Sequence, residues 1–284
     1  MSTPASPSFP RSRAAVGAVG GTFTAPERTG STNADLLARA ADQEHGSVLV
    51  TLDQTAGRGR LDRSWSAPAG ETLAASLLVR ADLDERDRGW LPLVAGAAMR
   101  DAIAALLPGS AVVGGADGAE PSRASRPTTD VVVKWPNDVQ VDGRKVCGIL
   151  CQVAGDGSVV VGAGVNLTIP ADRLPTPTAT SLVLAGATGT AGDLADAVLS
   201  AFHQAVLEAV AGLGAGGAAA ESVRSHVRAV CGTIGRRVRV ELPDGSVEEA
   251  DATAIDDAGR ITIRDRAGGL TPVAVGDVTH LRYA

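Results

Sequence analysis

Three valine-rich segments follow one another in the middle of the chain, with only short turn sequences between them. They read "VVVKW", "KVCGILCQV" and "SVVVGAGVNL", and the connections are "PNDVQVDGR" and "AGDG". Connections this short, rich in Gly, Asp and Asn, favour antiparallel neighbours, because parallel strands need a crossover of about a dozen residues or more. Residues 131–167 therefore predict an antiparallel meander at the centre of the fold.

Helical and extended patterns surround this meander. Apolar residues recur at helical spacing in residues 30–43, 90–107 and 192–213, the last with Asp193 as its expected N-cap, and a short helix is expected near 221–230. Extended, apolar patterns at 47–54 and 71–80 predict two further strands. The mixture predicts an α/β (α+β) domain.

The pattern changes after Cys231 to short alternating strands joined by the turns "PDG" and "DDAG", which predicts a small β-barrel over residues 232–284. Residues 1–14 are rich in Pro and Ser and lack large apolar side chains, so we expect a disordered tail. Residues 114–130 have a similar composition and predict a mobile surface insertion. Residues 15–231 are then expected to form the main domain.

Composition excludes several classes of protein. The net charge of −6 and a pI near 5.3 leave no general basic field for nucleic acid. Every apolar run is interrupted before the roughly 20 residues that a membrane span needs, and the N-terminus lacks a signal-peptide pattern. We expect a cytoplasmic protein. The three cysteines and four histidines show no ligand spacing, so no protein-held metal is predicted.

The segment "QTAGRGRLDRSW", residues 54–65, concentrates positive charge in this acidic chain. Gly57 and Gly59 permit close backbone approach to a ligand, and Arg58, Arg60 and Arg63 supply planar bidentate donors. Phosphate is the natural partner of such a loop. Taken alone, the segment is also compatible with a solvated loop or a nonspecific RNA contact.

Two other segments carry polar chemistry beside apolar strands. Lys134 ends a run of three valines, so its ammonium needs an anionic partner or a route to water. Gly162 and Gly164 lie in the strand "VVVGAGVNL" and leave room for a ligand or a crossing backbone. The stretch "GSTN" at a helix start offers donors for a small polar group, or is a simple helix cap.

Taken in order, "GSTN", "DQTAGRGRLDRSW", "ETLAASLLVR", "VVVKWPNDVQVDGRKVCGIL", "VVVGAGVNL" and "ATSL" resemble the catalytic domain of biotin protein ligases over residues 22–230. The region ending "GDVTHLRYA" is similar to that family's C-terminal domain. The resemblance implies a class II aminoacyl-tRNA-synthetase-like domain with a mixed or antiparallel sheet, followed by an SH3-like β-barrel. It implies biotin activation with ATP as biotinyl-5'-AMP and transfer to a lysine of a biotin carboxyl carrier domain of acetyl-CoA or acyl-CoA carboxylase. Mg²⁺ is expected with ATP.

The resemblance also implies residue roles. It makes Lys134, Arg58 and Arg60 the catalytic residues. The implied biotin-binding residues are these three with Ser31, Thr32, Asn33, Gln54, Gly59, Gly148 and Gly164, and the implied ATP-binding residues are Arg58, Arg60, Arg63, Trp65, Lys134, Asn137 and Asn166. Asp138 also falls on the family pattern, with a less defined role.

Some features depart from the family or leave alternatives. Gly30 precedes "STN" where many members have an acidic residue. The residues before "STN" are too few for the N-terminal DNA-binding domain of some members, so we predict no DNA partner. We also expect no membrane partner, and a monomer or weak homodimer. A lipoate-protein ligase-like enzyme and a non-enzymatic RNA-binding module are the alternatives. The GRGR and KWPND pair disfavours the first, and the acidic balance without interleaved aromatics disfavours the second.

Overall fold

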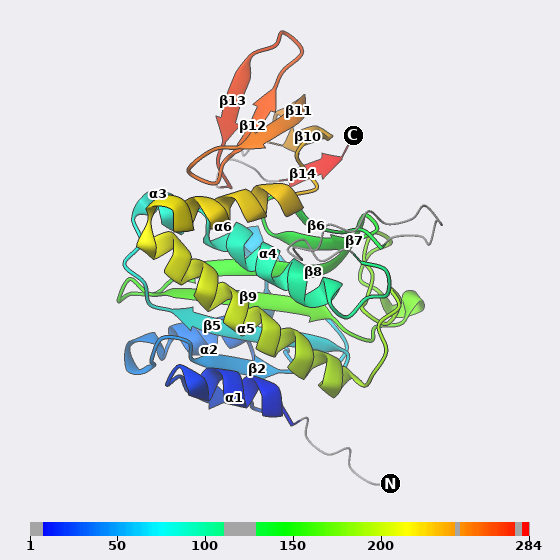
Figure 1. Cartoon of the computed structure of the whole chain (residues 1–284). Helices are drawn as coiled ribbons and strands as arrows, with labels where there is room; N and C mark the ends of the chain where they lie inside the picture. The colour runs from blue at the N-terminus through cyan, green and yellow to red at the C-terminus, as the bar shows by residue number, and fades with distance from the viewer. Residues whose placement is uncertain (1–7, 111–128, 242–244, 276–279, 284) are drawn as a thin grey trace.

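A computed structural model describes residues 8–110, 129–241, 245–275 and 280–283 (Figure 1). Its main part is built on a seven-stranded sheet in the order β1-β2-β5-β9-β8-β7-β6. The strands are β1 (Phe23–Thr24), β2 (Val48–Thr51), β5 (Thr72–Val79), β6 (Val131–Lys134), β7 (Asp138–Val141), β8 (Arg144–Val153) and β9 (Val159–Asn166). Only β1 and β2 pair in parallel, so the sheet is mixed.

The predicted antiparallel meander is confirmed as β6 to β9. One part of the prediction was wrong, because "PNDVQVDGR" is not only a connection but contains β7. Asp142 and Gly143 both adopt positive φ, at 49° and 76°, and make the tight turn between β7 and β8. The turn pairs β7 with β8 and so adds a fourth strand to the meander.

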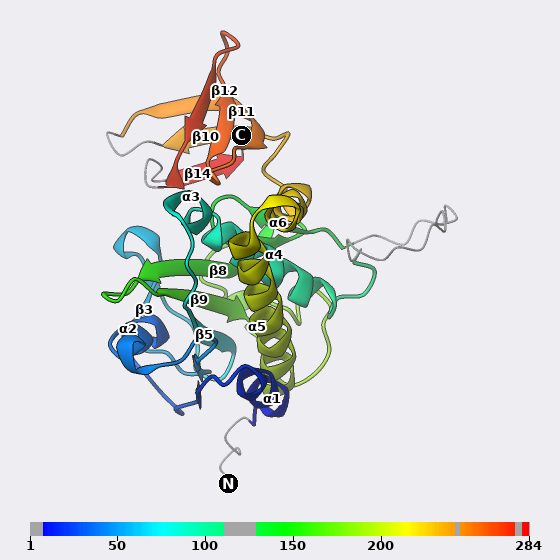
Figure 2. The ribbon, with the colours of Figure 1, turned by 60° about the vertical axis from the view of Figure 1, so that its left-hand side comes forward.

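The two faces of the sheet carry different elements (Figure 2). One is covered by α1 (Pro10–Ala18), α4 (Leu91–Ala104), α5 (Ala191–Ala215) and α6 (Gly217–Val230), whose apolar sides form the core with the sheet. On the opposite face lie α2 (Thr32–Leu37) and a hairpin of β3 (Gly57–Arg58) and β4 (Ser64–Trp65). Short helical turns are α3 (Glu85–Arg88), η1 (Ala40–Asp42), η2 (Arg60–Asp62) and η3 (Ala171–Arg173).

Helix α5 begins one turn earlier than the predicted cap implies. Thr190 is the N-cap, and Asp193 is the third helical residue, which completes a capping box with Thr190. The helix is long and apolar enough to cross a membrane by composition alone. Here, Leu194, Val198 and Phe202 are buried against the rest of the domain, as in the core helix of a globular fold.

The predicted disordered tail over 1–14 was partly wrong, because α1 begins at Pro10 and packs against α5. Phe9 is buried, and the Asp196 carboxylate of α5 accepts hydrogen bonds from the Ser12 amide at 2.9 Å and the Ser12 hydroxyl at 2.8 Å. Composition could not reveal this distant carboxylate. Residues 1–7, and most of the predicted insertion at 114–130, lie outside the described residues.

The C-terminal part is the small β domain that was predicted. Its five antiparallel strands follow the order β13-β12-β11-β10-β14. They are β10 (Arg237–Glu241), β11 (Val247–Ile255), β12 (Ile261–Arg264), β13 (Leu270–Val273) and β14 (His280–Tyr283). Two tryptophan side chains of the main domain form hydrogen bonds to the C-terminal domain. Trp90 Nε1 donates to Asp257 O at 2.8 Å, and Trp135 Nε1 donates to Gly259 O at 3.1 Å. We propose the domain boundary at 231/232, between α6 and β10.

Candidate active site

One row of cross-strand partners crosses the sheet on the α2 side. It runs through Ala74 of β5, Gly164 of β9, Gly148 of β8, Asp138 of β7 and Lys134 of β6. Residues that lie directly opposite each other in neighbouring strands project from the same face. Because three adjacent positions are Ala or Gly, the row forms a shallow floor with charged side chains at one end.

The ring of Trp65 lies over this floor. A Cβ atom added to Gly164 would stand 2.7 Å from Trp65 Cε2, and one added to Gly148 would stand 3.3 Å from Trp65 Cζ3. Trp65 Nε1 is buried and has no hydrogen-bond partner among the described residues. The glycines therefore provide space, as predicted, but the ring of Trp65 uses it.

A second row, two residues along the strands, consists of Ser76, Gly162 and Leu150. A Cβ atom on Gly162 would overlap the Asn33 amide, 2.1 Å from Oδ1. Asn33 Nδ2 donates to Leu150 O at 3.1 Å, and Ser76 Oγ lies 2.6 Å from Asn33 Oδ1. Asn33 of α2 is thereby fixed against the sheet.

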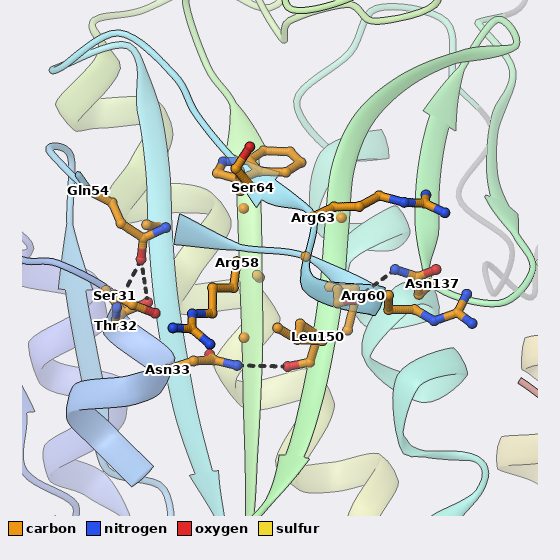
Figure 3. Close-up of a pocket in the computed structure, with 18 of the residues that line it drawn as sticks. Ser31, Thr32, Asn33, Gln54, Arg58, Arg60, Arg63, Ser64, Asn137 and Leu150 are labelled. Atoms are coloured by element: carbon orange, nitrogen blue, oxygen red, sulfur yellow. Dashed lines mark hydrogen bonds between the residues drawn. The ribbon is translucent and has the colours of Figure 1, made fainter. Parts of the chain in front are cut away.

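The start of α2 is held to the strand end before the hairpin. Ser31 is the N-cap of the helix, and its side chain accepts from the Ala34 amide at 3.4 Å. Thr32 N and Oγ1 both donate to Gln54 Oε1, at 2.9 and 3.2 Å (Figure 3). The "STN" segment is thus both a helix cap and a wall of the site.

The two rows, α2 and the hairpin enclose a cavity of about 170 Å³. Its lining residues are Ser31, Thr32, Asn33, Gln54, Arg58, Gly59, Arg60, Arg63, Ser64, Trp65, Ala74, Asn137, Asp138, Lys145, Gly148, Ile149, Leu150, Gly162, Ala163 and Gly164. Fourteen residues were assigned to the site from the sequence, and all of them except Lys134 and Asn166 line this cavity.

The arginine segment, for which the sequence indicated a loop, forms a hairpin. Gly57 pairs with Trp65, and Gly59 N donates to Arg63 O at 2.7 Å. Figure 3 shows Arg58 pointing toward the Asn33 end of the cavity, with Arg60 and Arg63 toward the Asn137 end. The hairpin thus distributes its three guanidinium groups over both ends of the cavity.

Arg60 also reaches the C-terminal domain, where its Nη2 donates to Val275 O at 2.7 Å. Burial, with a contribution from the nearby Arg63 charge, lowers the pKa of Arg60. An arginine stays protonated in any case. The hairpin is therefore anchored to the second domain through a charged side chain.

The lysine of the cavity is Lys145, which our sequence reasoning missed. Val139 faces Cys147 but Gln140 faces Lys145, so Val146 is an extra residue in β8. Such a bulge changes the face from which the side chain next to the extra residue projects, here that of Lys145. Lys145 Nζ consequently lies 2.6 Å from Asp138 Oδ1 and 5.5 Å from the Trp65 ring centre.

Two predicted site residues, Lys134 and Asn166, are not among the residues that line the cavity. Lys134 is on the edge strand, one strand beyond Asp138, and its Nζ lies 5.3 Å from the Tyr283 ring centre. It thus lies beside the Asp138 end of the cavity, and its role in the reaction stays a prediction. Asn166 is 2% exposed, and its amide donates to Thr180 O at 2.9 Å, so it stabilises a loop in the core.

The other residues that sequence reasoning missed are small or apolar. They are Ser64, Ala74, Ile149, Leu150 and Ala163, with Gly162 and Asp138 noted but given no place in the site. Their only sequence signal is alternation, since Ala74 and Ser76, and Gly162 and Gly164, are spaced by two. Alternation identifies a face but not the face that lines the site.

The charge balance of the cavity suits an anionic ligand. Arg58, Arg60, Arg63 and Lys145 are set against the single carboxylate of Asp138. No Cys or His is among the described lining residues, and burial raises the pKa of the Cys151 thiol to about 12. The site therefore favours reactions that depend on positioning and charge neutralisation and need no enzyme nucleophile.

Comparison with known proteins agrees with this geometry. The model of the biotin/lipoate A/B protein ligase family matches residues 25–168, and that of the biotin protein ligase C-terminal domain matches residues 233–281. The biotin--[acetyl-CoA-carboxylase] ligase of Mycobacterium tuberculosis is 38% identical over 259 residues, which cover 90% of this chain and 87% of that protein. This chain belongs to the biotin protein ligase family.

Other members of the biotin protein ligase family are similar over smaller parts or in fold alone. The biotin--[acetyl-CoA-carboxylase] ligase of Paracoccus denitrificans is 35% identical over 144 residues, covering 49% of this chain and 52% of that protein. The Aquifex aeolicus biotin protein ligase, solved in complex with biotin and ATP, superposes with a TM-score of 0.69 at 20% identity and covers 93% of this chain and 99% of that one. Both domains thus have the fold of this family.

Proposed function

We propose that this protein is a biotin--[biotin carboxyl-carrier protein] ligase. In the first step a biotin carboxylate oxygen bonds to the α-phosphorus of ATP, the bond to the β-phosphate oxygen breaks, and pyrophosphate leaves. In the second step the amine of a carrier-domain lysine attacks the acyl carbon of biotinyl-5'-AMP, and AMP leaves as the amide forms. The lysine loses its extra proton to solvent.

The observation that carries this proposal is the placement of cations in the cavity. Arg58 lies at the end formed by Asn33, Thr32 and Gln54, and Lys145 lies over the glycine floor. We assign the polar end to the biotin head group and the floor to the reacting carboxylate and α-phosphate. Fixed cations at that point stabilise the negative charge that grows at phosphorus.

Mg²⁺ is expected to arrive with the phosphates of ATP. Among the described residues there is no group of three or more His, Cys, Asp or Glu side chains that could hold a metal ion. Asp138 is the one carboxylate of the described cavity wall and is already paired with Lys145. The donor set fits an ion carried mainly by phosphate oxygens and water, which neutralises phosphate charge.

The hairpin that carries the arginines is an element separate from the sheet, and we propose that it covers the site. An acyl-adenylate hydrolyses if water reaches it, so a cover over the site preserves it until the acceptor lysine arrives. Trp65 and the three arginines belong to that cover. The acceptor is proposed to be the carrier domain of a biotin-dependent carboxylase. Cytoplasmic location, monomer or weak homodimer, and the absence of DNA and membrane partners stay predictions.

The test is exchange of labelled pyrophosphate into ATP, run with biotin and with lipoate as the acid. Biotin-dependent exchange is expected, followed by labelling of an isolated carrier domain. Exchange with lipoate alone would assign the protein to the lipoate ligases. Absence of exchange with both acids, together with salt-dependent RNA retention on filters, would support the RNA-binding alternative.

A further inference from the structure

Ser76 of β5 is a buried serine that is neither a sequence-predicted site residue nor part of the cavity lining. It is 1% exposed, and it contacts two side chains of α2 that line the polar end of the cavity. Its Oγ lies 2.8 Å from Thr32 Oγ1 and 2.6 Å from Asn33 Oδ1. One hydroxyl group of the sheet therefore holds both residues of the "TN" pair.

These contacts form a chain of four oxygen atoms, which we call the acceptor wall. The chain runs from Gln54 Oε1 through Thr32 Oγ1 and Ser76 Oγ to Asn33 Oδ1, and its first contact measures 3.2 Å (Figure 3). The amide oxygens at its two ends can only accept, so the hydrogens must come from the two hydroxyl groups. Three contacts share these two hydrogens, and both are therefore used within the wall.

The amide hydrogens of the same segment are used as well. Thr32 N donates to Gln54 Oε1 at 2.9 Å. Asn33 Nδ2 donates to Leu150 O at 3.1 Å and to Gln152 Oε1 at 2.9 Å, which uses both of its hydrogens and fixes the side on which the amide oxygen lies. The side chains of Thr32, Asn33 and Ser76 consequently contribute acceptor oxygens to the polar end and no donor.

Gly162 provides the space for this network. Ser76 and Gly162 face each other across β5 and β9, and a Cβ atom on Gly162 would stand 2.1 Å from Asn33 Oδ1. Asn33 reaches Ser76 because this position has no side chain. Without the serine hydroxyl, the Asn33 oxygen would lose its donor and the Thr32 hydroxyl would be held from one side only.

We infer that Ser76 is a positioning residue that fixes Thr32 and Asn33 as hydrogen-bond acceptors, so that the polar end selects a head group by its N–H donors. The inference rests on the proposed function for the identity of that head group, because the ureido ring of biotin carries such donors. The dithiolane ring of lipoate carries none. Binding it would bury the acceptor wall without a donor, and a polar site of this kind rejects such a ligand.

The test measures biotin binding to the full-length protein without ATP, by isothermal titration calorimetry. We expect Ser76→Ala to weaken the Kd about tenfold or more, and Ser76→Cys to weaken it about threefold or more, because a thiol is a weak donor of similar size. Ser47→Ala is the matched control: Ser47 is also fully buried, its Oγ accepts from the Thr22 amide at 3.0 Å, and it does not line the cavity. A folded Ser76→Cys protein that binds biotin as tightly as wild type would overturn the inference.

A second ligand separates this role from a general loss of packing. Biotin methylated on either ureido nitrogen lacks one N–H donor, and wild type should bind at least one of the two isomers about a hundredfold more weakly than biotin. In Ser76→Ala the same methylation should cost about tenfold or less, because the acceptors are no longer fixed. Equal losses in the two proteins would refute the role of Ser76.

Pyrophosphate exchange by the wild type distinguishes failure of this inference from failure of the proposed function. If wild type exchanges with biotin while Ser76→Ala shows the same Kd and the same cost of methylation, the inference fails and the proposed function stands. If wild type neither binds biotin nor exchanges pyrophosphate, the proposed function fails and the selection of biotin by the acceptor wall fails with it.

Discussion

Gly148 and Gly164 face each other across β8 and β9, and the ring of Trp65 lies against both of them. The contact connects the hairpin that carries the arginines to the centre of the sheet. A side chain at Gly164 would displace the ring, whereas one at Gly148 would need only a small shift of Lys145 or the ring.

Gly164→Ala is expected to reduce biotin-dependent exchange about tenfold or more, because its Cβ would stand 2.7 Å from the Trp65 ring. Gly148→Ala should cost less, since its nearest contacts, at 3.2 and 3.3 Å, include the mobile end of Lys145. Gly155→Ala is the matched control, as nothing lies within 4 Å of its Cβ position. Exchange rates and thermal midpoints of the three variants measure this, and equal rates for Gly164→Ala and Gly155→Ala would contradict it.

Lys145→Met is expected to lower adenylate formation about a hundredfold or more while the protein stays folded, because a cation aimed at the growing charge is lost. Arg144→Gln is the control, since Arg144 is the exposed neighbour at the start of β8. The measurement is exchange at saturating biotin and ATP, with circular dichroism for folding. If Lys145→Met kept wild-type activity, another group would have to supply the charge.

Asn33→Ala is expected to raise the KM for biotin about tenfold and leave the KM for ATP within about twofold. Its amide holds Ser76 and Leu150 at the polar end, away from the Asn137 end. Loss of these bonds should also cost about 1–2 kcal/mol of stability. Arg39→Gln, at an exposed position just after α2, controls for general effects on the helix. Equal changes in both KM values would place Asn33 outside the biotin end.

The pair of His226 on α6 and Asp101 on α4 predicts a pH-dependent stability. His226 Nε2 lies 2.7 Å from Asp101 Oδ2, and this hydrogen bond raises the pKa of His226. A raised folded-state pKa adds stability that is complete below the unfolded value of about 6.5 and is lost as pH rises through the folded value. His226→Gln should therefore destabilise by up to about 1 kcal/mol at acidic pH and less at alkaline pH.

Urea unfolding of wild type and His226→Gln at pH 5.5 and pH 9 measures this difference. The two pH values lie about one unit below and about 2.5 units above the pKa of a free histidine. Ser222→Ala, at an exposed position one turn earlier on α6, should show a difference that does not vary with pH. A His226→Gln cost that is larger at alkaline pH would reverse the predicted sign.

Several parts of the fold could be predicted because their signals are local. The valine runs with short turns specify β6, β8 and β9, and the apolar spacing of residues 91–104 specifies α4. Helix α1 could not be predicted, since Asp196, which caps it, lies far along the chain. Asn166 fitted the family pattern, yet its amide is used by Thr180 O.

The sequence by itself determined the family, the order of the elements and the arginine-rich chemistry, because motifs, periodicity and turn residues act within a few positions. Only the tertiary structure decided where the two lysines lie relative to the cavity. One extra residue in β8 and the register of β6, β7 and β8 place Lys145 over the glycine floor and Lys134 beneath Tyr283. Register arises from pairing between strands, so no property of either lysine's own neighbours could have distinguished them.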